Sequence, residues 1–259
     1  MENTKTVKAL KKQLVAAIAM VLVAAVALGS STYAWFVTNN KVDATTSTIS
    51  AQSNAAFMTI ANGTSGAKSV DTTSVTTGVE TKALYPATFG EETGSTKGTF
   101  MTGYGTALDN GTLKGGLTEI GAPEAAVTKG YALKQDYNVS SKGQNLTELK
   151  VEKVENAKNA NSTSKLANAL RVLVTSADGK AWVVYGLNAE GDAYEVKLSS
   201  ETSADVVLGS VTAGEDTPVH VYLYYEGKDT NVTTEELQGG QLTATNAVTV
   251  YFTATANNK

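Results

Sequence analysis

The side chains able to do chemistry are few in this chain, and their numbers limit the reactions that it could support. The sequence has one histidine, His220, and no cysteine. Catalytic zinc usually has at least two histidine or cysteine ligands, and no His-Glu-x-x-His segment is present. A hydrolase would also need a nucleophile, a base and a group that orients the base. We therefore expect no catalytic set and no metal centre, with His220 hydrogen-bonded locally.

Two groups of oxygen-bearing side chains near the C-terminal half are the remaining metal candidates. Asn188, Glu190 and Asp192 lie close together in sequence, and so do Glu226 and Asp229. Carboxylate and amide oxygens suit calcium, but neither group has the spacing of an EF-hand loop. Solvated turn carboxylates are the favoured interpretation, calcium binding is the alternative, and no cofactor is expected.

Three tyrosines could form a binding face for a ligand. Tyr222, Tyr224 and Tyr251 each alternate with apolar residues, so each should point to the outer side of its strand. Flat aromatic rings could stack on sugars, which makes these tyrosines a candidate carbohydrate face. The alternative is that they belong to the core, or to a face covered by a loop or a neighbouring subunit.

Alternating apolar residues predict the strands that position these groups. Leu170, Val172 and Val174 fall on one face of a segment that reads as a half-buried strand. The Asp178-Gly179 pair then predicts a tight hairpin, and a similar turn follows at 190–192.

The clearest strands lie at the C-terminal end. In residues 219–225 the aliphatic side chains share a face with Tyr225, opposite the face that carries His220. In residues 247–255 the inward positions are Val248, Val250 and Phe252. A short helix is expected at 233–237. Strands at regular spacing, separated by turns, predict an all-β fold that is an antiparallel, jelly-roll-like β-sandwich.

Residues 61–130 differ from the rest of the chain. Glycine, threonine, serine and asparagine crowd together there, and the apolar runs are short. Such composition favours turns over long strands. We expect a loop-rich insertion that decorates the sandwich, and a small second domain is the alternative.

The N-terminal segment predicts export. Basic residues precede an apolar run from Leu14 to Leu28, and a small-residue exit ends at Ala34. As a helix the run would be roughly 22 Å long, short of the ~30 Å hydrocarbon core. We expect residues 1–34 to be a signal peptide cut between Ala34 and Trp35, leaving residues 35–259 as one secreted domain. Retention of the run as a membrane anchor is the alternative.

Cleavage would also change the charge of the protein. It would remove four lysines and one glutamate, so the formal net charge would go from −4 to −7. A mildly acidic chain of this kind lacks the basic footprint of a nucleic-acid-binding protein. Contact with a membrane is expected only through an uncleaved signal.

The exit of this segment resembles that of the TasA/camelysin group, secreted proteins of Gram-positive bacteria. The resemblance is carried by Ser31-Thr32-Tyr33-Ala34-Trp35-Phe36 and by Val42-Asp43-Ala44-Thr45, within a match that covers about twenty-five residues at the N-terminal end. Two later segments, 170–172 and 222–229, are similar to stretches of uncharacterised clostridial secreted proteins. Ser47-Thr48-Ile49-Ser50-Ala51 departs from the Gly-Thr-Leu-Asp-Leu strand that is usual in the group.

The resemblance implies a jelly-roll subunit of an extracellular fibre or biofilm matrix, matured by a dedicated signal peptidase. In that group the freed N-terminal segment can become a strand of the neighbouring subunit, here within residues 35–50. Trp35, Phe36, Val37 and Val42 would fill the neighbour's pockets. The partners would be copies of the same chain and other matrix proteins.

Two other functions are compatible with the sequence. The first is a cell-surface adhesin or carbohydrate-binding module that uses the tyrosine face and the Gly/Thr-rich loops. The second is a secreted hydrolase, including the metalloprotease activity described for camelysin. It is disfavoured because a single histidine cannot complete a zinc site.

Overall fold

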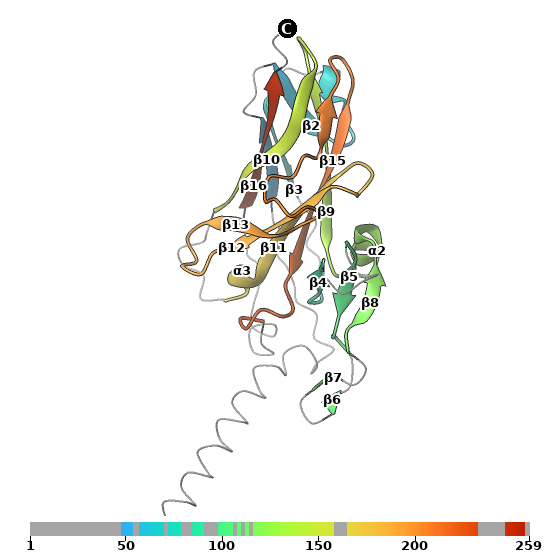
Figure 1. Ribbon diagram of the computed structural model, residues 1–259, viewed down its shortest axis with the longest axis vertical. Coiled ribbons are helices and arrows are strands. Elements are labelled where there is room, and N and C mark those ends of the chain that lie inside the picture. Colours follow the sequence, from blue (N-terminus) through green and yellow to red (C-terminus); the bar gives the residue numbers. More distant parts are fainter. Residues whose placement is uncertain are drawn as a thin grey trace, which may run out of the picture.

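The computed structural model describes most of the chain after residue 47 (Figure 1). The described residues are 48–53, 57–69, 72–78, 84–90, 98–105, 108–109, 112–113, 116–157, 165–232 and 247–256. The expected signal peptide, the assembly residues between Trp35 and Val42, and the short helix expected at 233–237 lie outside them. Within these ranges, no helix has the length and apolarity needed to cross a membrane.

Two large sheets dominate the described part of the chain, which is all-β in class. One sheet contains β1 (Thr48–Ser53), β3 (Ser74–Gly78), β10 (Leu146–Ala157), β14 (Gly209–Val211) and β16 (Ala247–Ala256). The other contains β2 (Met58–Asn62), β9 (Leu133–Ser141), β11 (Leu170–Ser176), β12 (Trp182–Leu187), β13 (Tyr194–Ser199) and β15 (Thr217–Tyr225). Their strand orders are β14-β10-β16-β1-β3 and β13-β12-β11-β15-β9-β2.

Strand β1 departs from the antiparallel pattern that the sequence predicted. It pairs in parallel with β16, with Ile49 opposite Val248 and Ser53 opposite Phe252. On its other side it pairs antiparallel with β3. Neither neighbour is joined to β1 by a hairpin, because the chain passes from β1 to β2 in the opposite sheet.

The larger core lies between the two sheets, which face each other in the upper part of Figure 1. Val248, Val250 and Phe252 enter it from β16, and the aliphatic face of β15 enters it from the other sheet together with Tyr225. The inward faces predicted for these two strands are therefore confirmed. The hairpins expected around Asp178-Gly179 and residues 190–192 join β11 to β12 and β12 to β13 in antiparallel pairs.

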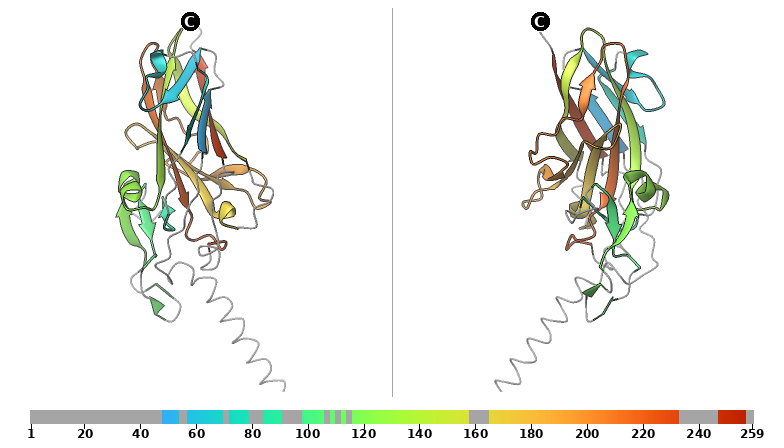
Figure 2. Two further views of the ribbon diagram at one scale, coloured as in Figure 1. Left: turned by 180° about the vertical axis from the view of Figure 1, so that it is seen from behind. Right: turned by 45° about the vertical axis from the view of Figure 1, so that its right-hand side comes forward.

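A second core covers the outer face of the six-stranded sheet. The covering segments are residues 84–90, 98–105 and 116–132, and we call them the cover. They contain β4 (Thr88–Phe89), β5 (Phe100–Thr102), β8 (Thr118–Gly121) and α2 (Pro123–Thr128), and the three strands form a small sheet in the order β4-β5-β8. Figures 1 and 2 show this small sheet and α2 beside the sandwich.

The cover overturns the expectation that residues 170–175 form a half-buried strand. All seven residues of β11 are buried, because Leu173 packs with Phe89 and Phe100 of the cover while Leu170, Val172 and Val174 face the larger core. Residues 61–130 also supply the 3₁₀ turn η2 (Ala67–Ser69), strand β3 and a short hairpin of β6 (Leu108–Asp109) and β7 (Thr112–Leu113). This region therefore contributes sheet and core as well as turns.

Trp182 is the largest side chain at the contact between sheet and cover. Its ring meets Phe89 edge to face, with 5.0 Å between ring centroids. Gly90 lies against the indole with φ of +72°, and a Cβ there would sit 2.9 Å from the ring. Glycine suits this position because it adopts positive φ without strain and leaves room for the indole.

The second core predicts a large effect for a substitution in the cover. Phe100 is fully buried and meets Tyr224 edge to face at 5.0 Å. Phe100→Ala should lower the free energy of unfolding by about 3–5 kcal/mol, the usual cost of such a cavity. Denaturant unfolding monitored by circular dichroism would measure it, with Thr118→Ala on the exposed side of β8 as the control. A loss near that of the control would contradict an integral role for the cover.

Candidate functional site

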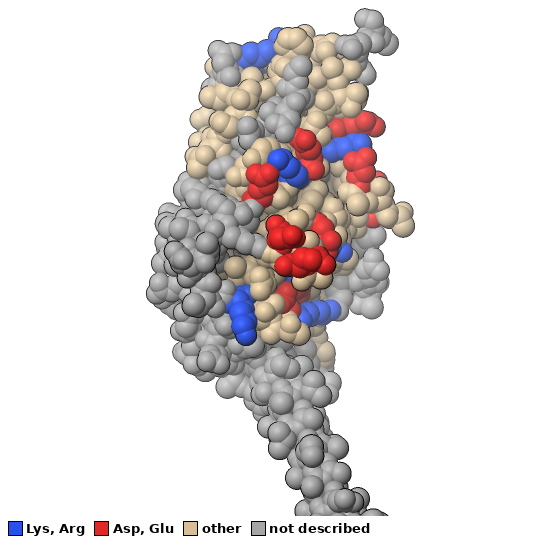
Figure 3. Space-filling model, turned by 90° about the vertical axis from the view of Figure 1, so that its left-hand side faces the viewer, with Lys and Arg blue, Asp and Glu red and all other residues tan. Residues whose placement is uncertain are grey.

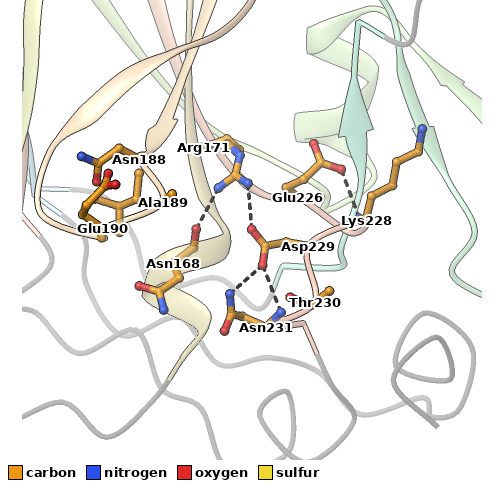
Figure 4. A pocket seen from close by; sticks show the side chains of 12 residues that line it. Asn168, Arg171, Asn188, Ala189, Glu190, Glu226, Lys228, Asp229, Thr230 and Asn231 are labelled. Carbon is orange, nitrogen blue, oxygen red and sulfur yellow. Dashed lines mark hydrogen bonds and ion pairs between the residues drawn. The ribbon is translucent and has the colours of Figure 1, made fainter. Parts of the chain in front are cut away.

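A polar hollow of about 630 Å³ lies at one end of the six-stranded sheet (Figure 4). It is formed by the short helix α3 (Leu166–Ala169), the start of β11, the β12–β13 turn and the segment after β15. Amide, carboxylate and cationic side chains dominate its wall. They belong to Asn168, Arg171, Asn188, Glu190, Glu226, Lys228, Asp229 and Asn231.

Arg171 is the centre of the hollow, and its guanidinium group has a partner on each side. Nη1 donates to the main-chain oxygens of Asn168 at 2.8 Å and Leu170 at 3.2 Å. Nη2 donates to Oδ2 of Asp229 at 2.8 Å. Both charged side chains are largely buried, with 11% of Arg171 and 15% of Asp229 exposed. Arg171 therefore fixes the end of α3 and the segment after β15 at once.

The opposite strand makes room for this arginine. Gly186 of β12 pairs with Arg171 in the sheet. A Cβ at position 186 would come within 2.7 Å of Cδ and 2.8 Å of Nε of Arg171. Because atoms cannot approach so closely, only glycine lets the arginine side chain lie flat across β12 toward Asp229.

Asp229 organises the turn that follows β15. Its Oδ1 accepts hydrogen bonds from the main-chain N–H of Asn231 at 3.0 Å and from Nδ2 of the same residue at 2.8 Å. With Oδ2 bound to Arg171, both of its oxygens are engaged. The hollow is therefore built from groups that hold one another in place.

Glu226 lies on the cover side of the same hollow. Its Oε1 accepts the main-chain N–H of Lys228 at 3.1 Å. Burial raises the pKa of Glu226, and the nearby charge of Asp229 adds to this rise. Hydrogen bonds from Lys228 and Thr88 and the charge of Arg171 oppose the rise in pKa without cancelling it. The surroundings therefore bias Glu226 toward its protonated form.

The structure brings together the two oxygen-rich groups that the sequence offered for calcium. In the described ranges, however, no group of three or more histidine, aspartate or glutamate side chains is placed to hold a metal ion. Asn188 Oδ1 already accepts hydrogen bonds from the N–H groups of Asp192 and Ala193. Oδ2 of Asp229 accepts a hydrogen bond from Arg171. These oxygens of Asn188 and Asp229 are therefore engaged by protein groups, and calcium binding stays the untested alternative.

Acidic side chains elsewhere on this side of the molecule are solvated or paired with lysine. Figure 3 shows Asp and Glu gathered in the middle of the described surface, with Lys beside them. Lys197 lies 2.6 Å from Glu195 on β13, and Lys153 lies 2.6 Å from Glu155 on β10. Exposed pairs of this kind contribute little to stability.

His220 belongs to a separate polar cluster on the outer face of the six-stranded sheet. Its Nδ1 lies 2.5 Å from Oδ1 of Asp136, the residue opposite it on β9. Lys134 binds Asp136 at 2.9 Å and Glu124 of α2 at 2.6 Å, and the Tyr222 hydroxyl donates to Glu124 at 3.0 Å. The histidine is thus hydrogen-bonded locally, as expected, and it has an acidic partner that the sequence did not reveal.

This cluster ties α2 to the sheet. Partial burial would raise the pKa of Glu124, but hydrogen bonds from Lys134 and Tyr222 hold it below its ordinary value. Partial burial acts in the same way on the pKa of Asp136, and hydrogen bonds from Lys134 and His220 lower it. Both carboxylates therefore stay ionised and hold the lysine between them. The arrangement anchors the cover, and it engages Nδ1 of His220 with Asp136.

The three tyrosines proposed as a ligand face are not one surface. Tyr222 and Tyr224 lie in the second core, 2% and 1% exposed, beneath the cover. Tyr251 lies on β16 in the other sheet, where its hydroxyl donates to Glu155. The alternative interpretation, a tyrosine face covered by a loop, describes Tyr222 and Tyr224.

Sequence reasoning missed Arg171 as the centre of the hollow. A signal was present, because Arg171 is the only arginine of a chain with twenty lysines and stands inside an apolar strand. Arginine suits a buried, multiply bonded position better than lysine. The two segments that carry the weaker resemblance, 170–172 and 222–229, turn out to be joined by the Arg171–Asp229 pair.

No family model, curated protein or solved structure matches the chain. The resemblance to the TasA/camelysin group therefore stays a prediction from the N-terminal residues.

The pairing of Arg171 with Asp229 predicts strong energetic coupling. Arg171→Met should destabilise the fold by about 3–5 kcal/mol, since Asp229 would be left buried without its partner. Asp229→Asn should also destabilise it, and the double variant should lose much less than the sum. Urea unfolding of the four proteins would measure the coupling. Lys197→Met in the exposed pair should cost less than about 1 kcal/mol. If the losses of stability of Arg171→Met and Asp229→Asn simply added up in the double variant, the predicted coupling between the two side chains would be contradicted.

The raised pKa of Glu226 predicts that the stability of the protein depends on pH. Its pKa in the folded protein is above the ordinary value of 4.5, so the native state keeps a proton that the unfolded chain has lost. The wild type should therefore lose stability as pH rises from about 4.5 through the folded pKa, and Glu226→Gln should remove that loss.

Unfolding at a series of pH values would test this dependence. Asp136→Asn is the matched control, because Asp136 has a lowered pKa and stabilises the wild type above its ordinary value of 3.8. The stability of the Asp136→Asn variant should therefore drop below that of the wild type as pH rises. A Glu226→Gln curve parallel to that of the wild type would refute the prediction.

Proposed function

We propose that this chain is a secreted, non-enzymatic subunit of an extracellular fibre or biofilm matrix at the surface of a Gram-positive bacterium. In this proposal, cleavage between Ala34 and Trp35 frees a segment that docks onto a neighbouring copy as an added strand. The exit sequence and the strand pattern motivate it. The structural observation that supports it best is the position of β1.

Strand β1 lies in the interior of its sheet, with β16 on one side and β3 on the other. Both of its hydrogen-bonding edges are therefore used. A segment just N-terminal to β1 cannot fold back on β1 as a hairpin without displacing one of these neighbours. An extended segment starting at Trp35 would have to find a sheet edge elsewhere, and a neighbouring copy offers one.

The length of the segment fits this role. Residues 35–47, thirteen in all, precede β1, and an extended chain of that length could reach roughly 40 Å. In the described sheets, β13 is an edge strand of six residues that pairs with β12 alone. Its backbone is a suitable acceptor, and Trp35, Phe36, Val37 and Val42 would supply the apolar contacts.

We further infer that the two sheets form a jelly-roll-like sandwich preceded by a signal helix. Support comes from the way the chain changes sheets, between β1 and β2, between β9 and β10, and between β15 and β16. Repeated crossing from one sheet to the other is how a jelly roll is wound.

A surface adhesin is the second candidate function, and the hollow around Arg171 favours it. The hollow is polar, preorganised by the Arg171–Asp229 pair and large enough for a small polar ligand. Such sites use a few fixed polar groups to orient what they bind. Glu190, which is exposed at the rim, is the group most able to contact a ligand.

Assembly through the N-terminal segment makes a sharp prediction. The secreted protein should begin at Trp35 and form filaments visible by negative-stain microscopy, and Trp35→Ser with Val37→Ser should leave monomers. Because the chain has no cysteine, single cysteines can report contacts. Val37→Cys mixed with Lys197→Cys should give a disulfide-linked dimer, whereas the exposed Thr118→Cys should not. Persistent wild-type monomers, or an uncleaved Met1 end, would sink the proposal.

A further inference from the structure

We propose that Tyr85, Tyr104 and Tyr131 form a binding platform for a neutral polysaccharide on the cover. The proposal concerns a binding activity of the folded subunit and does not depend on fibre assembly. It replaces the tyrosine face that the sequence suggested with a different set of rings.

The three rings come from separate segments and meet at one place. The Tyr85 and Tyr104 rings have centroids 4.6 Å apart and are tilted by 30°, and the Tyr131 ring lies 5.6 Å from that of Tyr85. All three side chains are partly exposed, in contrast to the buried Tyr222 and Tyr224. Neither core cluster counts these rings among its buried members, although Tyr131 packs at the edge of the second.

A single buried threonine holds the platform together. The hydroxyl of Thr102, a residue only 4% exposed, donates to the main-chain oxygen of Pro86 at 2.9 Å, next to Tyr85. It accepts the N–H of Tyr104 at 2.9 Å and is also hydrogen-bonded to the side chain of Tyr131. The N–H of Tyr85 in turn donates to the main-chain oxygen of Gly130 at 2.9 Å. The backbone around the rings is thus fixed before any ligand arrives, which lowers the entropic cost of binding.

The residues next to each of these tyrosines in sequence are small or apolar and carry no charge, and the groups whose charge acts on the hydroxyls of Tyr104 and Tyr131 are other tyrosines of the platform. The immediate neighbours are Leu84, Pro86, Gly103, Gly105, Gly130 and Ala132. A Cβ added at Gly105 would meet nothing within 4 Å, so the space next to Tyr104 is open. The nearest cation in sequence, Lys129, is turned away and donates to the main-chain oxygen of Ile120 at 2.9 Å.

This chemistry selects the class of ligand. The parts of the rings that stay exposed offer apolar surface on which a sugar can stack. Burial and the neighbouring rings raise the pKa of Tyr104 and Tyr131, so both hydroxyls stay uncharged well above physiological pH. A neutral sugar has both an apolar C–H face and hydroxyls. An anionic or cationic polymer would find no opposite charge on the residues next to the rings in sequence.

Affinity electrophoresis of the full secreted protein would test the platform. Native gels would contain hydroxyethylcellulose, laminarin or galactomannan, with alginate as the anionic comparison. At least one neutral polysaccharide should slow the wild type, and added salt should change this little. Tyr104→Ala and Tyr131→Ala should each weaken the apparent affinity about tenfold, equivalent to ~1.4 kcal/mol. Tyr251→Ala removes a tyrosine of the other sheet and should leave the mobility unchanged.

A second measurement uses only the wild-type protein and so does not depend on whether the variants fold. Tetranitromethane nitrates accessible tyrosines, and mass spectrometry locates the products. The retarding polysaccharide should protect Tyr104 and Tyr131 and leave Tyr251 reactive. Filament formation is scored in parallel by microscopy, so that loss of sugar binding and loss of assembly can be told apart. Retardation by alginate alone, no retardation by any neutral polysaccharide, or equal protection of Tyr251 would overturn the proposal.

Discussion

Burial of strands β11 and β12 of the six-stranded sheet on both faces is the constraint on which the rest of this structure depends. One face packs against the five-stranded sheet and the other against the cover, so every residue of β11 and β12 is buried. A sheet with one solvated face would show clean alternation, as an antiparallel sandwich usually does. Here the outer face carries Leu173, Trp182 and Tyr224, and these side chains require the cover.

Double burial also decides where polar groups can lie. A charged side chain within the covered area would lose its hydration without compensation. The two polar clusters accordingly lie to either side of the covered area, with Arg171 and Asp229 at one end of β11 and β15 and His220 with Asp136 further along the sheet. Each cluster also anchors a neighbouring segment, the turn after β15 in the first case and α2 in the second. Both clusters therefore hold the cover and the neighbouring loops against the sheet.

The sequence predicted the parts of the fold that local pattern controls. The inward faces of β15 and β16 and the hairpins around β12 follow from period-two alternation and from turn residues, which neighbouring residues determine. The cover was not foreseen because its strands have only two to four residues, too few to show a period. Without the cover, the sequence could not decide whether Tyr222 is exposed or buried.

Local sequence patterns do not show which residues far apart in the chain come into contact. The contact of Arg171 with Asp229 spans 58 positions, and that of His220 with Asp136 spans 84. The platform of Tyr85, Tyr104 and Tyr131 depends on three turns meeting over Thr102, which no spacing rule encodes. Only the isolation of Arg171 among twenty lysines marked its position as unusual.

The position of β1 limits which pairings are open to any strand that precedes it in the chain. A strand at the edge of its sheet could accept the preceding residues as a hairpin partner, and the N-terminal segment would then be satisfied within its own molecule. Interior placement between β16 and β3 removes that option. Parallel pairing with β16 adds to this effect, because a parallel neighbour is not reached through a two-residue turn. The backbone hydrogen bonds that complete the five-stranded sheet therefore leave neither edge of β1 open to a further strand.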